Sequence, residues 1–119
     1  MRKCMRANRC PVPKREREKG LEFQRVIAQR LRVYFGDQVR SGAQYRKGTD
    51  ACDVEGTPWW IECKRGKSPQ LRGALKQAEE ATDGRPVLAI THEDQEKPGQ
   101  GAKEWVAMPW KLFEALLRH

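Results

Sequence analysis

The sequence predicts an α/β fold, with a mixed β-sheet of about five strands and helices packed on it. Three observations favour this class. Apolar residues recur at helical spacing in residues 21–35 and 71–81, residues 49–67 contain two short strand-like runs around a turn, and residues 86–91 form an apolar run typical of a buried strand. The predicted order is helix, two or three strands, helix, strand, strand, helix. In 119 residues, this order allows a single domain.

The first helix is predicted over residues 21–35. Phe23, Ile27 and Leu31 lie at the spacing of one helical face, and Gly36 follows as a helix stop. This stripe indicates an amphipathic helix that covers a sheet.

Residues 38–46 are interpreted as one bent or bulged strand, because Gly42 argues against an uninterrupted one. Two further strands are predicted within residues 49–67, on either side of a tight turn at Gly56 and Thr57. This part of the chain therefore predicts an antiparallel hairpin.

The second half of the chain is predicted to alternate helix and strand. The expected elements are a helix between Pro69 and Gly84, a strand at residues 86–91, a polar loop at 93–103, a strand at 105–108 and a helix that begins at Pro109.

The chain is strongly basic, since 24 Lys and Arg against 16 Asp and Glu give a formal net charge of +8. Residues 1–20 hold eight of the basic and two of the acidic residues, which predicts a basic N-terminal arm at residues 1–18 before one domain at 19–119. No apolar run approaches the roughly 20 residues of a membrane span, no secretory signal is evident, and four cysteines do not suggest a disulfide scaffold. We therefore expect a cytoplasmic protein with a polyanionic partner, such as nucleic acid or an anionic surface.

The hairpin carries the residues of chemical interest. Side chains alternate along a strand, so Glu62 and Lys64 share a face with Trp60. A two-residue turn would pair Asp53 with Trp60 and place Asp53 diagonal to Glu62, on the face expected to carry charge. A shift of one residue would pair Asp53 with Ile61 and direct the carboxylate to the apolar face.

Two carboxylates at this separation are able to share a divalent cation, and Mg²⁺ takes carboxylate, water and phosphate oxygens. The ammonium of Lys64 would orient the attacking water and offer charge to a phosphate in the transition state. This set suits metal-assisted phosphodiester hydrolysis. The alternative is that Asp53, Glu62 and Lys64 form a charge ladder on a solvated strand.

Asp53, followed after eight residues by Glu62-Cys63-Lys64, resembles the Asp…Glu-x-Lys motif of the PD-(D/E)XK nuclease superfamily. The branch that it resembles most is that of the Holliday junction resolvases. The order of elements is similar over roughly residues 19–118, including the Arg40-Ser41-Gly42 segment before the hairpin. The resemblance implies a restriction-endonuclease-like αβββαβ core.

The resemblance also implies roles for individual residues. Asp53, Glu62 and the backbone carbonyl of Cys63 would bind Mg²⁺, for which Mn²⁺ would substitute, and Lys64 would be the catalytic lysine. Gln77, on the following helix, would approach the site as a further catalytic residue. The family's helix acid falls at Gln24; Gln24, Glu22 and Asp50 are accessory candidates.

The predicted DNA-binding residues surround the acidic motif in sequence and would contact phosphates on either side of the scissile bond. They are Arg40, Ser41, Arg46, Lys47, Arg65, Lys67, Arg72 and Lys76. Of the four tryptophans, at least three are expected in the core, with Trp60 on the charged face as the candidate for stacking on bases.

The sequence thus predicts a Mg²⁺-dependent endonuclease that cuts branched DNA in the manner of a Holliday junction resolvase. Such an enzyme is expected to be a homodimer, and the closing helix with Trp110, Phe113 and Leu117 is the candidate dimer face. By the same resemblance, the short chain suits a nuclease domain encoded by a virus or mobile element. The alternatives are a nicking, flap-cutting or sequence-specific nuclease of the same superfamily, or a non-catalytic DNA-binding module.

Overall fold

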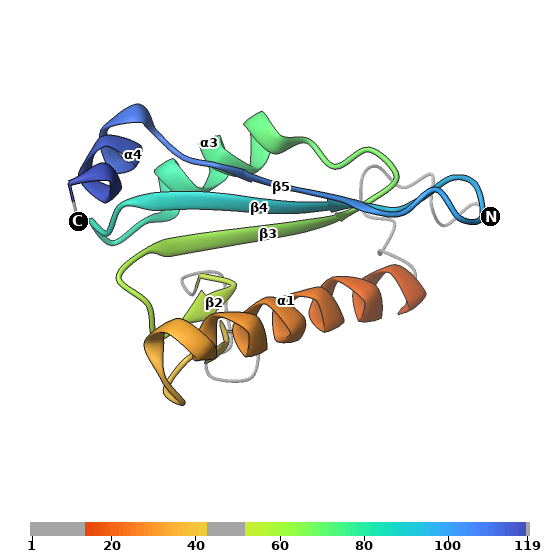
Figure 1. Ribbon diagram of the computed structural model, residues 1–119, viewed down its shortest axis with the longest axis horizontal. Coiled ribbons are helices and arrows are strands. Elements are labelled where there is room, and N and C mark those ends of the chain that lie inside the picture. Colours follow the sequence, from red (N-terminus) through yellow and green to blue (C-terminus); the bar gives the residue numbers. More distant parts are fainter. Residues whose placement is uncertain (1–13, 43–51, 119) are drawn as a thin grey trace, which may run out of the picture.

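The computed structural model describes residues 14–42 and 52–118, which form a five-stranded sheet with helices packed on it (Figure 1). The predicted α/β class is therefore confirmed. The elements are α1 (Lys14–Phe35), β1 (Arg40–Ser41), β2 (Val54–Glu55), β3 (Trp60–Gly66), α3 (Leu71–Ala81), β4 (Val87–Glu93), β5 (Lys103–Ala107) and α4 (Trp110–Leu117).

Helix α1 begins at Lys14, seven residues before the predicted start. Six of the seven added residues are Lys, Arg or Glu, which are good helix formers even without an apolar face. The helix ends as predicted at Gly36, whose φ of 105° is in the left-handed region and whose N–H donates to the Arg32 carbonyl at 2.9 Å. Within the described residues, neither α1 nor any shorter helix combines the length and apolar character needed to cross a membrane.

The sheet has the order β1-β2-β3-β4-β5 and mixes two kinds of pairing. Strands β1, β2 and β3 are antiparallel neighbours, β3 and β4 are parallel, and β4 and β5 are again antiparallel. Helix α3 makes the crossover that the parallel pair requires. The site described below therefore lies on a central strand, β3, at the side where β2 stops.

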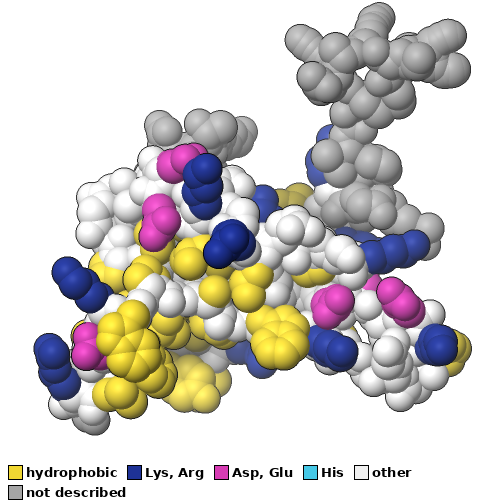
Figure 2. Space-filling model, turned by 90° about the horizontal axis from the view of Figure 1, so that it is seen from above, with side chains coloured by type: hydrophobic (Ala, Val, Ile, Leu, Met, Phe, Trp, Pro, Cys, Tyr) yellow, Lys and Arg dark blue, Asp and Glu magenta, His cyan; other side chains and the backbone are white. Residues whose placement is uncertain are grey.

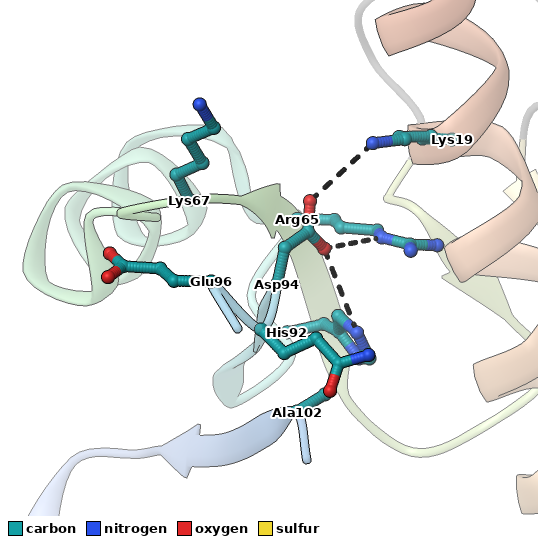
Figure 3. A pocket seen from close by; sticks show the side chains of 8 residues that line it. Lys19, Arg65, Lys67, His92, Asp94, Glu96 and Ala102 are labelled. Carbon is teal, nitrogen blue, oxygen red and sulfur yellow. Dashed lines mark hydrogen bonds and ion pairs between the residues drawn. The ribbon is translucent and has the colours of Figure 1, made fainter. Parts of the chain in front are cut away.

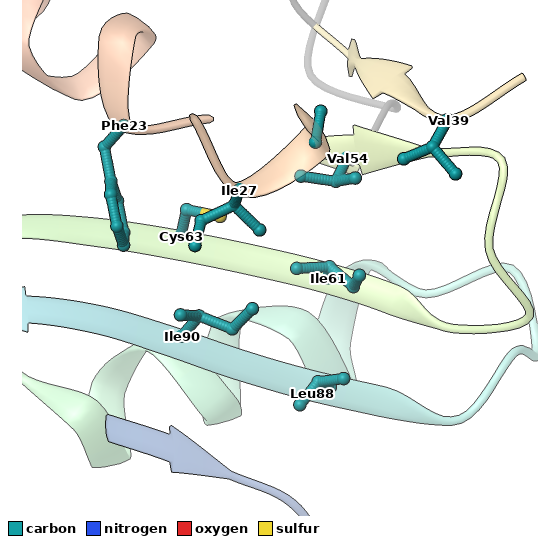
Figure 4. Close-up of a cluster of buried hydrophobic side chains, with 9 residues drawn as sticks. Phe23, Ile27, Val39, Val54, Ile61, Cys63, Leu88 and Ile90 are labelled. Carbon is teal, nitrogen blue, oxygen red and sulfur yellow. The ribbon is translucent and has the colours of Figure 1, made fainter. Parts of the chain in front are cut away.

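Both faces of β3 are buried. Ile61 and Cys63 face α1 and pack with Phe23, Ile27 and Leu88 in one cluster (Figure 4). Trp60 faces α3 and packs with Cys52, Ala78 and Val87 in a second cluster. The face that carries Trp60, Glu62 and Lys64 was expected to be a charged outer surface. This was wrong for Trp60 and Glu62, which are buried on the side of the strand that α3 covers, whereas Lys64 is half-buried.

The tryptophans are distributed differently from the prediction. Trp60, expected to be available for stacking, is 3% exposed beneath α3, and the Arg85 guanidinium lies 5.2 Å from its ring centre. Trp105 and Trp110 are 54% and 66% exposed, so the expectation of three core tryptophans was also wrong. The reason is position in the sheet: β5 is an edge strand, displaced to Lys103–Ala107 from the predicted 105–108, and α4 lies at the end of the sheet.

Candidate active site

A β-bulge next to Asp53 sets the geometry of the site. Val54 is paired with Ile61 of β3, and the N–H of Asp53 donates to the carbonyl of the same Ile61 at 2.9 Å. Two consecutive residues therefore oppose one, which is the definition of a bulge. The predicted pairing of Asp53 with Trp60 was wrong, because residues 56–59 rather than a two-residue turn connect β2 to β3.

The bulge breaks the alternation of side chains before β2. Val54 packs on the α1 side, whereas Cys52, two residues earlier, packs on the α3 side with Trp60. A regular strand would place residues 52 and 54 on one face. Asp53 therefore lies at the point where the side chains of this segment change from the α3 face of the sheet to the α1 face. This point is beside β3, where β2 no longer pairs with it.

The carboxylate of Asp53 takes the place of a missing strand partner. Its Oδ2 atom accepts a hydrogen bond from the backbone N–H of Cys63 at 2.7 Å. The N–H and C=O of one strand residue point to the same side, so the Cys63 carbonyl is directed to this side as well. The Asp53 carboxylate and the Cys63 carbonyl thus lie at the same edge of β3. The resemblance implies that this carbonyl is a metal ligand.

Gly42 holds the other side of the bulge. Its N–H donates to the Asp53 carbonyl at 2.8 Å, and a Cβ atom at this position would lie 1.9 Å from the Cys52 carbonyl oxygen. A side chain here would overlap the backbone that carries Asp53. The prediction that Gly42 interrupts the strand agrees with the end of β1 at Ser41.

Glu62 is buried beside this edge. It is 7% exposed, and its Oε2 atom lies 4.0 Å from Lys64 Nζ. The pKa of the Glu62 carboxyl is raised to about 7, mainly by burial and to a lesser degree by the negative charge of Asp53. The positive charge of Lys64 opposes this shift. The alternative of a solvated charge ladder does not describe Glu62, because an exposed ladder would leave its carboxylate in water.

Burial also raises the pKa of Asp53, although the Cys63 N–H and Lys64 act in the opposite direction. Two partly desolvated carboxylates that repel each other are an unfavourable arrangement unless a proton or a cation lies between them. We call Asp53, Glu62 and the Cys63 carbonyl, with Lys64 beside them, the acidic edge. Its hard oxygen atoms fit Mg²⁺ or Mn²⁺. In the described parts of the chain, no three His, Cys, Asp or Glu side chains come together as a larger metal cluster.

The accessory candidates differ in their positions. The Oε1 atom of Gln24 accepts a hydrogen bond from the buried Ser41 hydroxyl at 3.3 Å, which ties α1 to β1 next to the bulge. Glu22 is exposed on α1 and pairs with Arg25 at 3.6 Å. Gln77 is exposed beside the buried Ala78 of α3, and Asp50 lies outside the described residues.

The predicted DNA-binding residues are not all equally accessible. Ser41 is buried with its hydroxyl on Gln24, and the Nε atom of Arg65 donates to Asp94 at 3.0 Å. The exposed members within the described residues are Arg40, Arg65, Lys67, Arg72 and Lys76, and of these Arg65 is held by Asp94. Arg46 and Lys47 lie outside those residues.

A charged network at the far end of β3 and β4 was not anticipated from the sequence. Asp94 lies between Lys19, Arg65 and His92, at 3.6, 3.0 and 3.8 Å (Figure 3). On its other side, His92 contacts Glu104 at 3.0 Å. The only sequence signal is the polar triplet at residues 92–94 directly after an apolar strand, and its partners come from distant elements.

No protein-family model, curated protein or solved structure matches the chain. The α/β class follows from the sheet and the helices themselves. The chemistry of the acidic edge rests on the distances, burial and pKa directions given above.

Proposed function

We propose that the protein is a metal-dependent endonuclease that hydrolyses DNA phosphodiester bonds at the acidic edge. One observation carries the proposal: Glu62 is 7% exposed, and its carboxylate lies next to a second, partly buried carboxylate, that of Asp53. Buried carboxylates with raised pKa values are typical of functional sites. Mg²⁺ is the proposed cofactor, and Mn²⁺ is expected to replace it.

The bound cation would supply positive charge to a phosphate oxygen and lower the pKa of the attacking water. The chain positions the two carboxylates that would hold this cation. The hydrogen bond from Cys63 N–H holds one Asp53 oxygen, Oδ2, and so orients Oδ1. Glu62 approaches from the α3 face, where its neighbours exclude bulk water.

Lys64 is the proposed catalytic lysine. Its Nζ lies 4.0 Å from Glu62 Oε2, and its side chain is more exposed than that of Glu62. The ammonium is therefore placed at the boundary between the buried Glu62 carboxylate and solvent, where a phosphate would arrive. From there it would donate a hydrogen bond to a non-bridging phosphate oxygen as negative charge develops.

DNA is the proposed substrate, and branched DNA of the Holliday junction type is the proposed subclass. The excess of basic over acidic residues supports a polyanionic substrate. The branched subclass rests on the resemblance to the resolvases, as does the expectation that two copies cut two symmetric strands.

The test compares cleavage and binding of labelled DNA by the wild type, Glu62→Gln and Lys64→Ala with Mg²⁺. Glu79→Gln, on the exposed side of α3, and Lys111→Ala, on α4, are matched control variants. We expect cleavage by the wild type and both controls, and a loss of about 100-fold or more in the two site variants with binding retained.

Four-way junctions, flaps, single strands and linear duplexes separate the subclasses. Preferential cutting of the junction supports the resolvase type, and a preference for another substrate supports a different nuclease of the same chemistry. Binding without cleavage by the wild type, with either Mg²⁺ or Mn²⁺, would overturn the enzyme proposal in favour of a DNA-binding module.

A further inference from the structure

An apolar groove lies between the second half of α1 and the edge strand β5. Ile27, Leu31 and Tyr34 form its α1 wall, and Ile90 and Val106 belong to the sheet beside them. The charged residues of the groove are Arg30 and Glu104, which pair with each other at 2.9 Å. An apolar occupant would therefore cover the groove without leaving an unpaired charge.

Helix α4 presents an apolar face of its own. Leu112 is its buried residue, whereas Trp110, Phe113 and Leu117 are exposed at the i, i+3 and i+7 spacing of one helical face. Figure 2 shows hydrophobic side chains gathered at the α4 end of the molecule and continuing over its middle. None of the residues that line the groove belongs to α4.

We propose that these two surfaces bind each other between two copies of the chain, with α4 of each protomer in the groove of its partner. The elements that carry them lie toward the same end of the molecule: α1 ends there, β5 runs toward it and α4 follows (Figure 1). Two identical contacts related by a twofold axis close the assembly as a dimer and leave no further α4 or groove exposed.

The exposed apolar area is of the size that a dimer needs. An aromatic side chain buries about 150–250 Å² when fully covered. Trp105, Trp110, Phe113 and Tyr34 are between 41% and 78% exposed, and Val33, Val106, Leu116 and Leu117 add to them. Together they supply several hundred Å² from each protomer, close to the roughly 800 Å² per partner of a stable interface.

The dimer is argued from these apolar surfaces and not from the proposed chemistry, so a monomeric protein would overturn the dimer, and with it the expectation of paired cuts, without bearing on phosphodiester hydrolysis at the acidic edge. The experiment is sedimentation equilibrium of the full chain between about 1 and 100 µM. Val33→Glu changes the groove and Leu117→Glu changes α4, at side chains that are 80% and 65% exposed and therefore not needed for folding. Val26→Glu, on α1 but outside the groove, is the control.

We expect a dimer for the wild type and the control, and a dissociation constant raised at least about tenfold by either site variant. A second measurement identifies the contact directly. Val33→Cys protein mixed with Leu117→Cys protein, both carrying Cys4→Ser and Cys10→Ser, should form a disulfide-linked heterodimer under mild oxidation. Each protein alone should not.

Three results would overturn the proposal. The first is a wild-type monomer throughout the concentration range, and the second is a dimer that Val33→Glu and Leu117→Glu leave intact. The third is a dimer that is sensitive to Val33→Glu alone, because the groove would then be occupied by something other than α4.

Discussion

The backbone N–H of Cys63 donates a hydrogen bond of 2.7 Å to the Asp53 carboxylate, which thereby closes the edge of β3 where strand β2 has ended. A side chain that replaces a strand partner is held more rigidly than one on an open strand face. This bond places a carboxylate next to the buried Glu62.

Substitution of Asp53 separates its structural and its electrostatic roles. Asp53→Asn keeps an oxygen that accepts the Cys63 N–H, whereas Asp53→Ala leaves that donor without its partner. We expect Asp53→Ala to lower the free energy of unfolding by about 1–3 kcal/mol and Asp53→Asn to lower it less. Both should lose Mn²⁺ binding in calorimetry, since neither carries the charge. Mn²⁺ binding by Asp53→Asn equal to that of the wild type would show that Asp53 is not a ligand.

The stability of the metal-free protein should fall as the pH rises from about 4.5 to about 7. The folded state raises the pKa of Glu62 from 4.5 to about 7, so it binds this proton more tightly than the unfolded state does. The contribution of Glu62 to the free energy of unfolding is fully present below pH 4.5. It is lost progressively as the pH rises to 7, by up to about 3 kcal/mol.

Urea unfolding at several pH values in the presence of a chelator measures this loss. Glu62→Gln should flatten the pH dependence in that window, and saturating Mg²⁺ should reduce it in the wild type because the cation offsets the charge of both carboxylates. Glu79→Gln, at an exposed position on α3, should leave the profile unchanged. A Glu62→Gln profile as steep as that of the wild type would contradict the assignment.

Gly42→Ala should disturb the bulge. The added Cβ would meet the Cys52 carbonyl oxygen at 1.9 Å, so the backbone on both sides has to move. We expect a loss of about 2–4 kcal/mol in the free energy of unfolding and weaker Mn²⁺ binding. Gly20→Ala is the matched control, because no atom lies within 4 Å of a Cβ there and the substitution in α1 should stabilise by up to about 1 kcal/mol. Equal stability of the two variants would show that Gly42 is not constrained.

Removal of residues 2–13 should weaken DNA binding and lower its salt dependence. This segment carries four basic and no acidic residues, and α1 begins only at Lys14. The slope of log K against log salt should fall by up to about 0.9 for each phosphate that the shortened chain no longer neutralises, and cleavage of the bound DNA should persist. Titrations at several salt concentrations measure the slope. A truncated protein that binds DNA normally and does not cleave it would place this segment in the site.

Local patterns in the sequence determined the order of the elements. The apolar spacing of Phe23 and Ile27 predicted α1, Pro69 and Gly84 bracketed α3, and Pro109 preceded α4, because helix periodicity and caps depend on neighbours a few residues away. The same holds for the candidate residues Asp53, Glu62 and Lys64, whose chemical types are visible in the chain.

Only the tertiary structure decided how those residues meet. The bulge at Asp53 depends on Gly42 and Ile61, which come from two other segments, and the burial of Glu62 depends on α3 lying over its face of β3. The exposure of Trp105 follows from the place of β5 at the edge of the sheet. The physical reason is that strand register, bulges and burial are set by contacts between segments that are distant in the sequence, which no local spacing encodes.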